Sequence, residues 1–415
     1  LQTGIRRGTA SFAKIEQKVG PIIEDVRRRG DQAVLDYTAK FDGADSVPDS
    51  IEVASVDIDR AYSIVDEGIV RALRKAANNI RRFHERQVQQ TSVCILDDGT
   101  MMGQIIRPIE RVGLYVPGGA AAYPSSVLMG AIPARVARVS SVIACTPPGP
   151  GGAANPYVLV AADIAGVDRV FLAGGAQAVA ALAYGTETIP RVDKVVGPGN
   201  IFVATAKKQL FGTVGIDMVA GPSEILIVAD ETANPKFLAA DMLSQAEHDV
   251  LASAVLITNS EEIAEQTIEE IYKQAKSLSR KEIIEQSLEN YGAVIVSGSM
   301  DEAVGFANEL APEHIEICAR KPFEYIGRID NAGSVFLGNY SPEPLGDYFA
   351  GPNHVLPTGG TARFFSPLSV DTFVKKSSFI YYTEEALRSA SDDIIRLAEA
   401  EGLTAHANSI TVREK

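Results

Sequence analysis

The sequence predicts an α/β protein with two doubly wound domains, an N-terminal helical arm and a small C-terminal helical segment. The chain has 415 residues, which is enough for two or more domains. From about Arg111 onward, short runs of β-branched residues alternate with Gly/Pro turns and Ala-rich stretches. This alternation is typical of a parallel sheet covered by helices, and two such series follow one another along the chain.

The N-terminal part is predicted to be helical. Between Phe12 and Phe41, and again between Asp57 and Arg86, apolar residues recur at spacings of three and four. That period places them on one face of an amphipathic helix. His84 lies among charged residues near the end of the second stretch, so we expect it at the surface.

The predicted strands fall into two series. The first comprises residues 112–116, 142–145, 170–172 and 195–196, and the second comprises residues 225–228, 254–257, 294–296, 315–318 and 334–337. Helical segments are expected after Gly175, after Asn200 and over residues 383–401, with a loop over residues 402–408. The expected domains are an N-terminal arm at 1–20, a discontinuous α/β domain at 21–114 and 225–365, a second α/β domain at 115–224, and a C-terminal segment at 366–415.

Composition excludes several classes of protein. Asp and Glu number 53 against 39 Lys and Arg, so the net charge is −14, which argues against nucleic-acid binding. We expect no membrane span, because no run of about 18 apolar residues occurs. Three cysteines do not form a disulfide framework, which indicates a reducing compartment and a cytoplasmic location. Cys94, Cys145 and Cys318 lie in apolar runs and are expected to be buried.

Three Gly-rich loops are candidate anion-binding turns, at residues 115–119, 174–177 and 197–200. Glycines at a strand-to-helix turn let backbone N–H groups approach a phosphate. The dinucleotide fingerprint of Rossmann-like domains is incomplete, because Phe202 stands where the third glycine belongs, although Asp217 follows at about the spacing of a ribose-binding acid. Glycines that merely turn the chain remain the alternative.

Histidine is scarce in this chain, so the position of each histidine is informative. Of five, four lie in short polar clusters, near His248, His314, His354 and His406. Gln245 and His248 are three residues apart, so they share a helical face and could hold one metal ion. Nitrogen and oxygen ligands without a thiolate suit Zn²⁺ or another divalent transition metal. Taken singly, each histidine is more often an ordinary hydrogen-bonding residue.

Seven motifs resemble those of the histidinol dehydrogenase family, in the order of that family and over nearly the whole chain. They are GLYVPGG at 113–119, VVGPGN at 195–200, AGPSE at 220–224, SQAEHD at 244–249, APEHIE at 311–316, GDYFAGPNHVLPT at 346–358 and EGLTAHANS at 401–409. The resemblance implies NAD-dependent oxidation of L-histidinol to L-histidine through L-histidinal. It also implies homodimers whose sites borrow the partner's C-terminal segment.

The resemblance also implies roles for individual residues. The implied zinc ligands are Gln245, His248, Asp347 and His406. The implied catalytic pair is Glu313 and His314. The implied substrate contacts are Ser223, His314, Glu401 and the four zinc ligands, and the implied NAD contacts are Tyr115, Gln177 and Asn200. Glu401 and His406 would reach the site of the other subunit.

The catalytic roles can be argued from chemistry. His314 is suited to remove the alcohol proton, and Glu313 to activate the water that hydrates the aldehyde. Adjacent residues on an extended segment point to opposite faces, so this pair requires a turn or bulge, which Pro312 makes plausible. A nucleophilic Cys145 lacks an activating neighbour in the sequence, and we interpret it as structural.

Two alternative functions remain open on the residues alone. Metal-assisted hydrolysis would use the same ligands with Glu313 as base, but it leaves the Gly-rich loops without a role. A two-domain binding protein that closes on a small ligand fits the α/β pattern, but not the concentration of histidine and acidic residues in separate loops.

Overall fold

The computed structural model describes residues 9–118 and 123–414, and these residues divide between two compact units. Unit 1 is drawn from Leu1–Gln87 and Ile109–Phe373, and unit 2 from Val88–Pro108 and Val374–Lys415. Unit 1 contains two five-stranded parallel sheets, and unit 2 contains one three-stranded antiparallel sheet.

The two parallel sheets of unit 1 share one strand order. The β3 sheet runs β5 (Arg169–Leu172), β4 (Ser141–Thr146), β3 (Arg111–Tyr115), β6 (Lys194–Val196), β7 (Gly215–Ile216). The β8 sheet runs β10 (Gly292–Val296), β9 (Ser253–Thr258), β8 (Glu224–Ala229), β11 (His314–Cys318), β12 (Ser334–Leu337). In each, the chain winds outward from a central strand in both directions. The predicted α/β class with two doubly wound sheets is confirmed.

Helices cover both faces of each sheet. Those before and within the β3 sheet are α2 (Thr9–Arg29), α3 (Asp31–Phe41), α4 (Ser55–Ile64), α5 (Glu67–His84), α6 (Pro124–Val136), α7 (Pro156–Ala165), α8 (Gly175–Tyr184) and α9 (Ile201–Leu210). Those of the β8 sheet are α10 (Pro235–Ala246), α11 (Glu261–Ala275), α12 (Lys281–Tyr291), α13 (Met300–Leu310) and α14 (Glu343–Tyr348). Short 3₁₀ turns are η1 (Ala44–Ser46), η2 (Glu85–Gln87), η3 (Pro150–Gly152), η4 (Pro322–Glu324), η5 (Ile326–Arg328), η6 (Thr361–Arg363) and η7 (Val370–Phe373).

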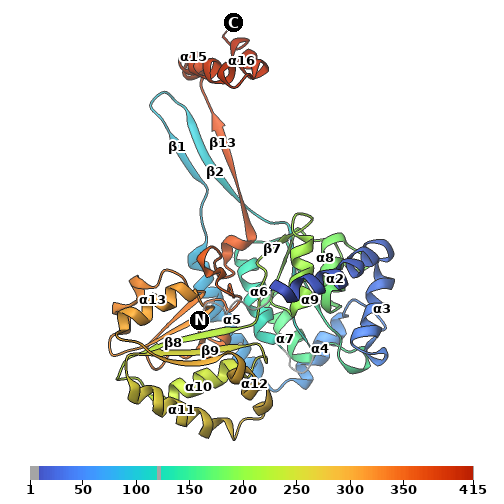
Figure 1. Ribbon diagram of the computed structural model, residues 1–415. Helices are drawn as coiled ribbons and strands as arrows, with labels where there is room; N and C mark the ends of the chain where they lie inside the picture. The colour runs from blue at the N-terminus through green and yellow to red at the C-terminus, as the bar shows by residue number, and fades with distance from the viewer. Residues whose placement is uncertain (1–8, 119–122, 415) are drawn as a thin grey trace. The chain divides into compact units, whose positions relative to one another are not determined.

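Successive side chains of a strand point to opposite faces, so the β8 sheet has one hydrophobic core on each face. Ile225 and Ile227 pack with Leu238 of α10, whereas Leu226 and Val228 pack with Val304 of α13. Figure 1 shows α10 and α11 together on one side of β8 and β9, with α13 on the other. Strands that are buried on both faces are continuous apolar runs in the sequence, which is why they could be predicted.

The N-terminal helices differ from expectation in two ways. The predicted helix over 12–41 breaks at Gly30, whose positive φ of 55° separates α2 from α3. Val26 of α2 and Val34 of α3 belong to the same core as Phe171 of the β3 sheet. The expected boundary at 20/21 therefore falls inside α2, and these helices pack with the β3 sheet, not with the sheet of residues 225–365. The expected boundary at 114/115 likewise falls inside β3.

The second predicted helix divides into α4 and α5, and its His84 is buried, not exposed. His84 follows Leu73, Ala77 and Ile80 at spacings of three and four, so it lies on the inward face of α5. Its Nδ1 lies 2.8 Å from the Ile80 carbonyl oxygen.

Unit 2 consists of β1 (Ser92–Ile95), β2 (Met101–Pro108) and β13 (Val374–Tyr381), in that order, with α15 (Glu384–Ala400) and α16 (Thr404–Thr411). Cys94 lies on β1, whose four residues are all exposed, so the expectation that it is buried was wrong. The expected loop over 402–408 was also wrong. Gly402, at a φ of 75°, ends α15, and the chain then re-enters a helix that packs on α15.

None of the helices within 9–118 and 123–414 combines the length and apolar character needed to cross a bilayer.

Candidate metal and substrate site

A cavity of about 350 Å³ in unit 1 gathers many of the predicted site residues. The predicted residues that line it are Tyr115, Asn200, Ser223, Gln245, His248, Glu313, His314 and Asp347. Tyr115 is the last residue of β3, and Asn200 follows β6, so both lie at carboxyl ends of strands, which is where doubly wound sheets bind ligands. Ser223 and Glu313 instead precede β8 and β11. The cavity therefore joins the carboxyl edge of one sheet to the amino edge of the other.

Glu313 ends the irregular segment between α13 and β11, and His314 is the first residue of β11. Ala311 adopts a left-handed conformation (φ 49°) after α13, and residue 313 lies in a bend. Both side chains meet the backbone of Glu224. The Glu224 N–H donates to Glu313 Oε2 at 2.9 Å, and His314 Nδ1 lies 3.0 Å from the Glu224 carbonyl oxygen. The interrupted strand start lets two adjacent residues serve one cavity.

These contacts fix the protonation pattern of His314. A carbonyl oxygen only accepts hydrogen bonds, so Nδ1 carries the hydrogen and Nε2 keeps its lone pair. His314 Nε2 is buried and has no hydrogen-bond partner. Burial lowers the pKa of His314 from 6.5 to about 4, because the charged imidazolium is poorly solvated there. At neutral pH the ring is therefore a neutral acceptor.

Glu313 is buried beside this ring. Its Oε2 lies 3.6 Å from His314 Nδ1, and its side chain is only 8% exposed. Burial raises the pKa of Glu313 well above its usual value, and the Glu224 N–H opposes that rise by hydrogen bonding to the carboxylate. A carboxyl group with a raised pKa accepts a proton more readily than an exposed glutamate does.

A group of possible metal ligands lies in the same cavity. Ligand atoms of His248, Glu343 and Asp347 all lie within 4.8 Å of one another. Glu343 and Asp347 are one turn apart on α14, and His248 follows α10, which ends at Ala246. The His248 N–H donates to the Gln245 carbonyl oxygen at 3.2 Å, which adds one more turn after α10. Gln245 and His248 are therefore on adjacent turns, as their spacing predicted.

Gln245 supplies an independent indication of a ligand. The side chain is 1% exposed, and neither Oε1 nor Nε2 has a hydrogen-bond partner. An unpaired buried amide costs about 1–3 kcal/mol, so a group that engages it is expected. Its oxygen, the His248 imidazole and the two carboxylates form a nitrogen and oxygen donor set that fits Zn²⁺.

Glu343 was missed by sequence reasoning, although its spacing offered a signal. Four residues before Asp347, it shares a helical face with that residue. Burial raises the pKa of Glu343 to about 8, and the nearby Asp347 carboxylate adds to this rise. Burial also raises the pKa of Asp347 to about 6. Two buried carboxyls in contact favour a cation between them.

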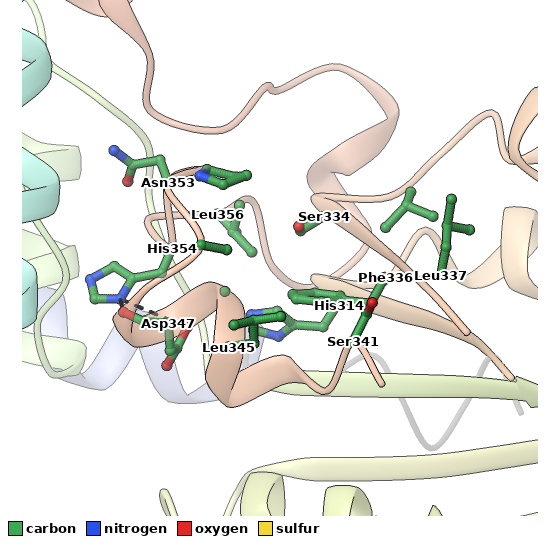
Figure 2. Close-up of a pocket in the computed structure, with 14 residues that line it drawn as sticks. His314, Ser334, Phe336, Leu337, Ser341, Leu345, Asp347, Asn353, His354 and Leu356 are labelled. Carbon is green, nitrogen blue, oxygen red and sulfur yellow. Dashed lines mark hydrogen bonds and ion pairs between the residues drawn. The ribbon is translucent and has the colours of Figure 1, made fainter. Parts of the chain in front are cut away.

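His354 is a second residue left unassigned by the sequence, although it lies in a family motif. Figure 2 shows its ring directed at Asp347, beside a neighbouring cavity of about 240 Å³ that His314 also lines. His354 Nδ1 lies 3.0 Å from the Asp347 carbonyl oxygen, and Ser126 Oγ lies 3.3 Å from Nε2. Burial lowers the pKa of His354 to about 4. A neutral His354 thus helps to orient Asp347.

The loop over 197–200 is built by close packing. Gly197 has a φ of 116°, and a Cβ there would lie 2.2 Å from the Tyr115 carbonyl oxygen. Asp217 Oδ2 accepts from the Gly197 N–H at 2.8 Å, and Lys207 Nζ donates to the Gly197 carbonyl at 3.0 Å. Lys207 and Asp217 also form a buried ion pair. Asp217 is therefore a support of this loop, and its 1% exposed side chain is not available to a ribose.

Two of the three predicted NAD contacts, Asn200 and Gln177, lie at the starts of helices. Asn200 Oδ1 caps α9 by accepting from the N–H groups of Phe202 and Val203. Gln177 is buried in the first turn of α8, and its Oε1 has no hydrogen-bond partner. The Tyr115 hydroxyl accepts from the Gly175 N–H at 3.1 Å, and burial raises the pKa of Tyr115 to about 12. The predicted loop over 115–119 ends at Gly119, which lies outside the described residues.

Two further predictions concern residues away from this cavity. Cys145 is fully buried, and burial raises the pKa of its thiol, which agrees with a structural role. Glu401 and His406 belong to unit 2, at the end of α15 and in α16, whereas the other predicted site residues belong to unit 1. Their contribution to the site stays a prediction.

Comparison with known proteins identifies the family. Residues 5–414 match the family model described as histidinol dehydrogenase. The chain belongs to the histidinol dehydrogenase family. The resemblance read from the sequence motifs is thereby confirmed.

The matches to similar proteins extend over almost the whole of both chains. The histidinol dehydrogenase of Clostridium acetobutylicum is 58% identical over 403 residues, which cover 97% of this chain and 93% of that protein. The histidinol dehydrogenase of Heliobacterium mobile is 55% identical, with 99% and 96% covered. The crystal structure of histidinol dehydrogenase from Elizabethkingia anophelis superposes with a TM-score of 0.92 at 39% identity, covering 98% of this chain and 96% of that one.

Proposed function

We propose that the protein catalyses the zinc- and NAD-dependent oxidation of L-histidinol to L-histidine through L-histidinal, the last two steps of histidine biosynthesis. The observation that carries this proposal is the neutral His314, which has an unpartnered Nε2 and lines the cavity that also holds the His248, Glu343 and Asp347 donors. Relatives named histidinol dehydrogenase at 53–58% identity support the choice of substrate.

The overall reaction converts one alcohol, one water and two NAD⁺ to one carboxylate, two NADH and three protons. Zn²⁺, held by Gln245, His248, Asp347 and His406, would orient the substrate's nitrogen atoms and polarise its oxygen. NAD⁺, held near Tyr115, Gln177 and Asn200, would accept both hydrides, because zinc is redox-inert.

His314 is proposed as the base of both oxidations. Its Nε2 accepts the hydroxyl proton as hydride leaves the carbinol carbon, and Nδ1–H stays bound to the Glu224 carbonyl oxygen. The imidazolium formed is stabilised by that carbonyl and by the Glu313 carboxylate 3.6 Å away. The low pKa of His314 favours release of the proton before the second oxidation.

Glu313 is proposed to activate the water that hydrates the aldehyde. Its carboxylate accepts a proton from this water as the oxygen attacks the aldehyde carbon, which gives a gem-diol. A pKa raised by burial makes the carboxylate a stronger base than an exposed glutamate. Ser223, Glu401 and His406 are proposed to contact the substrate.

We propose a homodimer in which Glu401 and His406 serve the partner's site, and a cytoplasmic location. Unit 2 supports a partner surface, because Ile95, Ile380 and Leu397 are each about 70% exposed. Large apolar side chains exposed to this extent are typical of a surface that another chain covers.

One assay separates this proposal from hydrolysis and from ligand binding without chemistry. Purified protein with L-histidinol and NAD⁺ is expected to form two NADH for each histidine. Chelation is expected to abolish turnover, and added Zn²⁺ to restore it. Absence of NADH would refute the oxidation, and turnover that is indifferent to chelators would refute the metal.

A further inference from the structure

We propose that Glu343 is a metal ligand of unit 1, which holds the cation together with Gln245, His248 and Asp347 when His406 is not engaged. This inference rests on the proposed zinc-dependent function. It assigns a ligand role to a buried carboxylate that the family motifs leave outside the ligand set.

The first support is the geometry of the three donors. Ligand atoms of His248, Glu343 and Asp347 lie within 4.8 Å of one another, and all three side chains line the cavity. Ligands around one zinc ion, each about 2 Å from it, are about 3.3–4 Å apart. Rotamer adjustments of less than about 1 Å would bring the three atoms to one ion.

The second support is how Glu343 is held. Its backbone N–H donates to Glu316 Oε1 at 2.8 Å, which fixes the start of α14. Ser244 Oγ lies 3.3 Å from Oε2, whereas Oε1 is buried and has no hydrogen-bond partner. The residue is only 1% exposed, so this oxygen meets no water, and the neighbouring group at the carboxyl is the Asp347 carboxyl. An uncommitted buried carboxylate oxygen is costly unless a cation or donor meets it.

The third support is independent of the acidic residues. Gln245 lines the same cavity, is 1% exposed and has no hydrogen-bond partner at either amide atom. Together the four side chains offer one imidazole nitrogen and three oxygens, which is a complete tetrahedral set for Zn²⁺. All four belong to unit 1, so the cation can bind before the C-terminal segment contributes His406.

The test uses the full chain and four variants: His406→Ala, Glu343→Gln, the two combined, and His406→Ala combined with Glu316→Gln. Glu316 is the matched control, because it is a buried carboxylate beside Glu343 that does not line the cavity. Zinc affinity is measured by competition with a chromophoric chelator, and coordination by the visible spectrum of the Co²⁺-substituted protein. Thermal unfolding of each metal-free variant checks the fold.

We expect His406→Ala to retain one Zn²⁺ per chain. Adding Glu343→Gln should weaken zinc binding by more than about 100-fold and change the Co²⁺ spectrum. A loss of affinity this large exceeds the loss caused by removing a residue that only supports a ligand. Adding Glu316→Gln should leave both the affinity and the spectrum unchanged, because the amide oxygen of glutamine can still accept from the Glu343 N–H. If Glu343→Gln does not fold, Glu343→Asp replaces it, with an expected loss of about tenfold because the carboxylate is withdrawn by one methylene.

The outcomes separate this inference from the proposed function. Equal zinc affinity and equal Co²⁺ spectra with and without Glu343→Gln in the His406→Ala background would overturn the ligand role. An equal effect of Glu316→Gln would overturn it as well, since any buried carboxylate would then suffice. A wild-type chain that binds no Zn²⁺ would instead refute the zinc dependence itself.

Discussion

Replacing His314 with Gln should remove a large part of the protein's acid sensitivity. The folded protein holds His314 neutral, with a pKa near 4, whereas the unfolded chain binds a proton at about 6.5. Between these values the unfolded state binds more protons, so the free energy of unfolding falls as pH falls from 6.5 to 4. Above pH 6.5 the full contribution is present.

The expected size follows from the two pKa values. At ~1.4 kcal/mol per pKa unit, the gap between 6.5 and about 4 corresponds to ~3 kcal/mol. About 2 kcal/mol of this should be lost by pH 5. His84 and His354 also have lowered pKa values, but they are present in both proteins, so their contributions cancel in the comparison.

The assay is urea unfolding of the metal-free protein at pH 7.5 and pH 5, at one protein concentration. Wild type should lose ~2 kcal/mol more than His314→Gln over this range. Gln245→Leu is the control, since it changes a buried polar residue of the same cavity that does not titrate. An equal loss in wild type and His314→Gln would refute the buried, neutral state of His314.

Three further outcomes are expected. Lys207→Met should lower Tm by about 5 °C, because it removes the ion-pair partner of the buried Asp217 side chain at a cost of ~3–5 kcal/mol; an unchanged Tm would contradict this ion pair. Gly197→Ala should weaken NAD⁺ binding and lower Tm more than Gly212→Ala does. Both glycines have positive φ, but only a Cβ at residue 197 would meet a backbone oxygen, so equal effects would argue against close packing at Gly197. Glu313→Gln should slow aldehyde oxidation about 100-fold in rapid-mixing kinetics and alcohol oxidation less, and equal losses would exclude the water-activating role.

Much of the site was predictable because its signals are local or specific. The motif residues Ser223, Glu313 and Asp347 were named from the sequence, and each lines the cavity. The expected irregularity before residue 314 also appears, at Ala311 and the bend that follows. Glu343 was missed because its spacing to Asp347 indicates only a shared helical face, and nothing local shows that a glutamate between two prolines is buried near His248.

The sequence by itself determined most of the strands and helices of the two parallel sheets and which residue types carry the chemistry. Doubly buried strands such as β8 are continuous apolar runs, and helix starts such as Asn200 carry capping residues, so both signals lie within a few positions of the chain. Only the tertiary structure decided where these segments meet. The contact between His314 and Glu224 joins residues 90 positions apart, and the pKa values at the site depend on burial. Burial is a property of the packed chain, because long-range contacts, not local spacing, exclude water from a side chain.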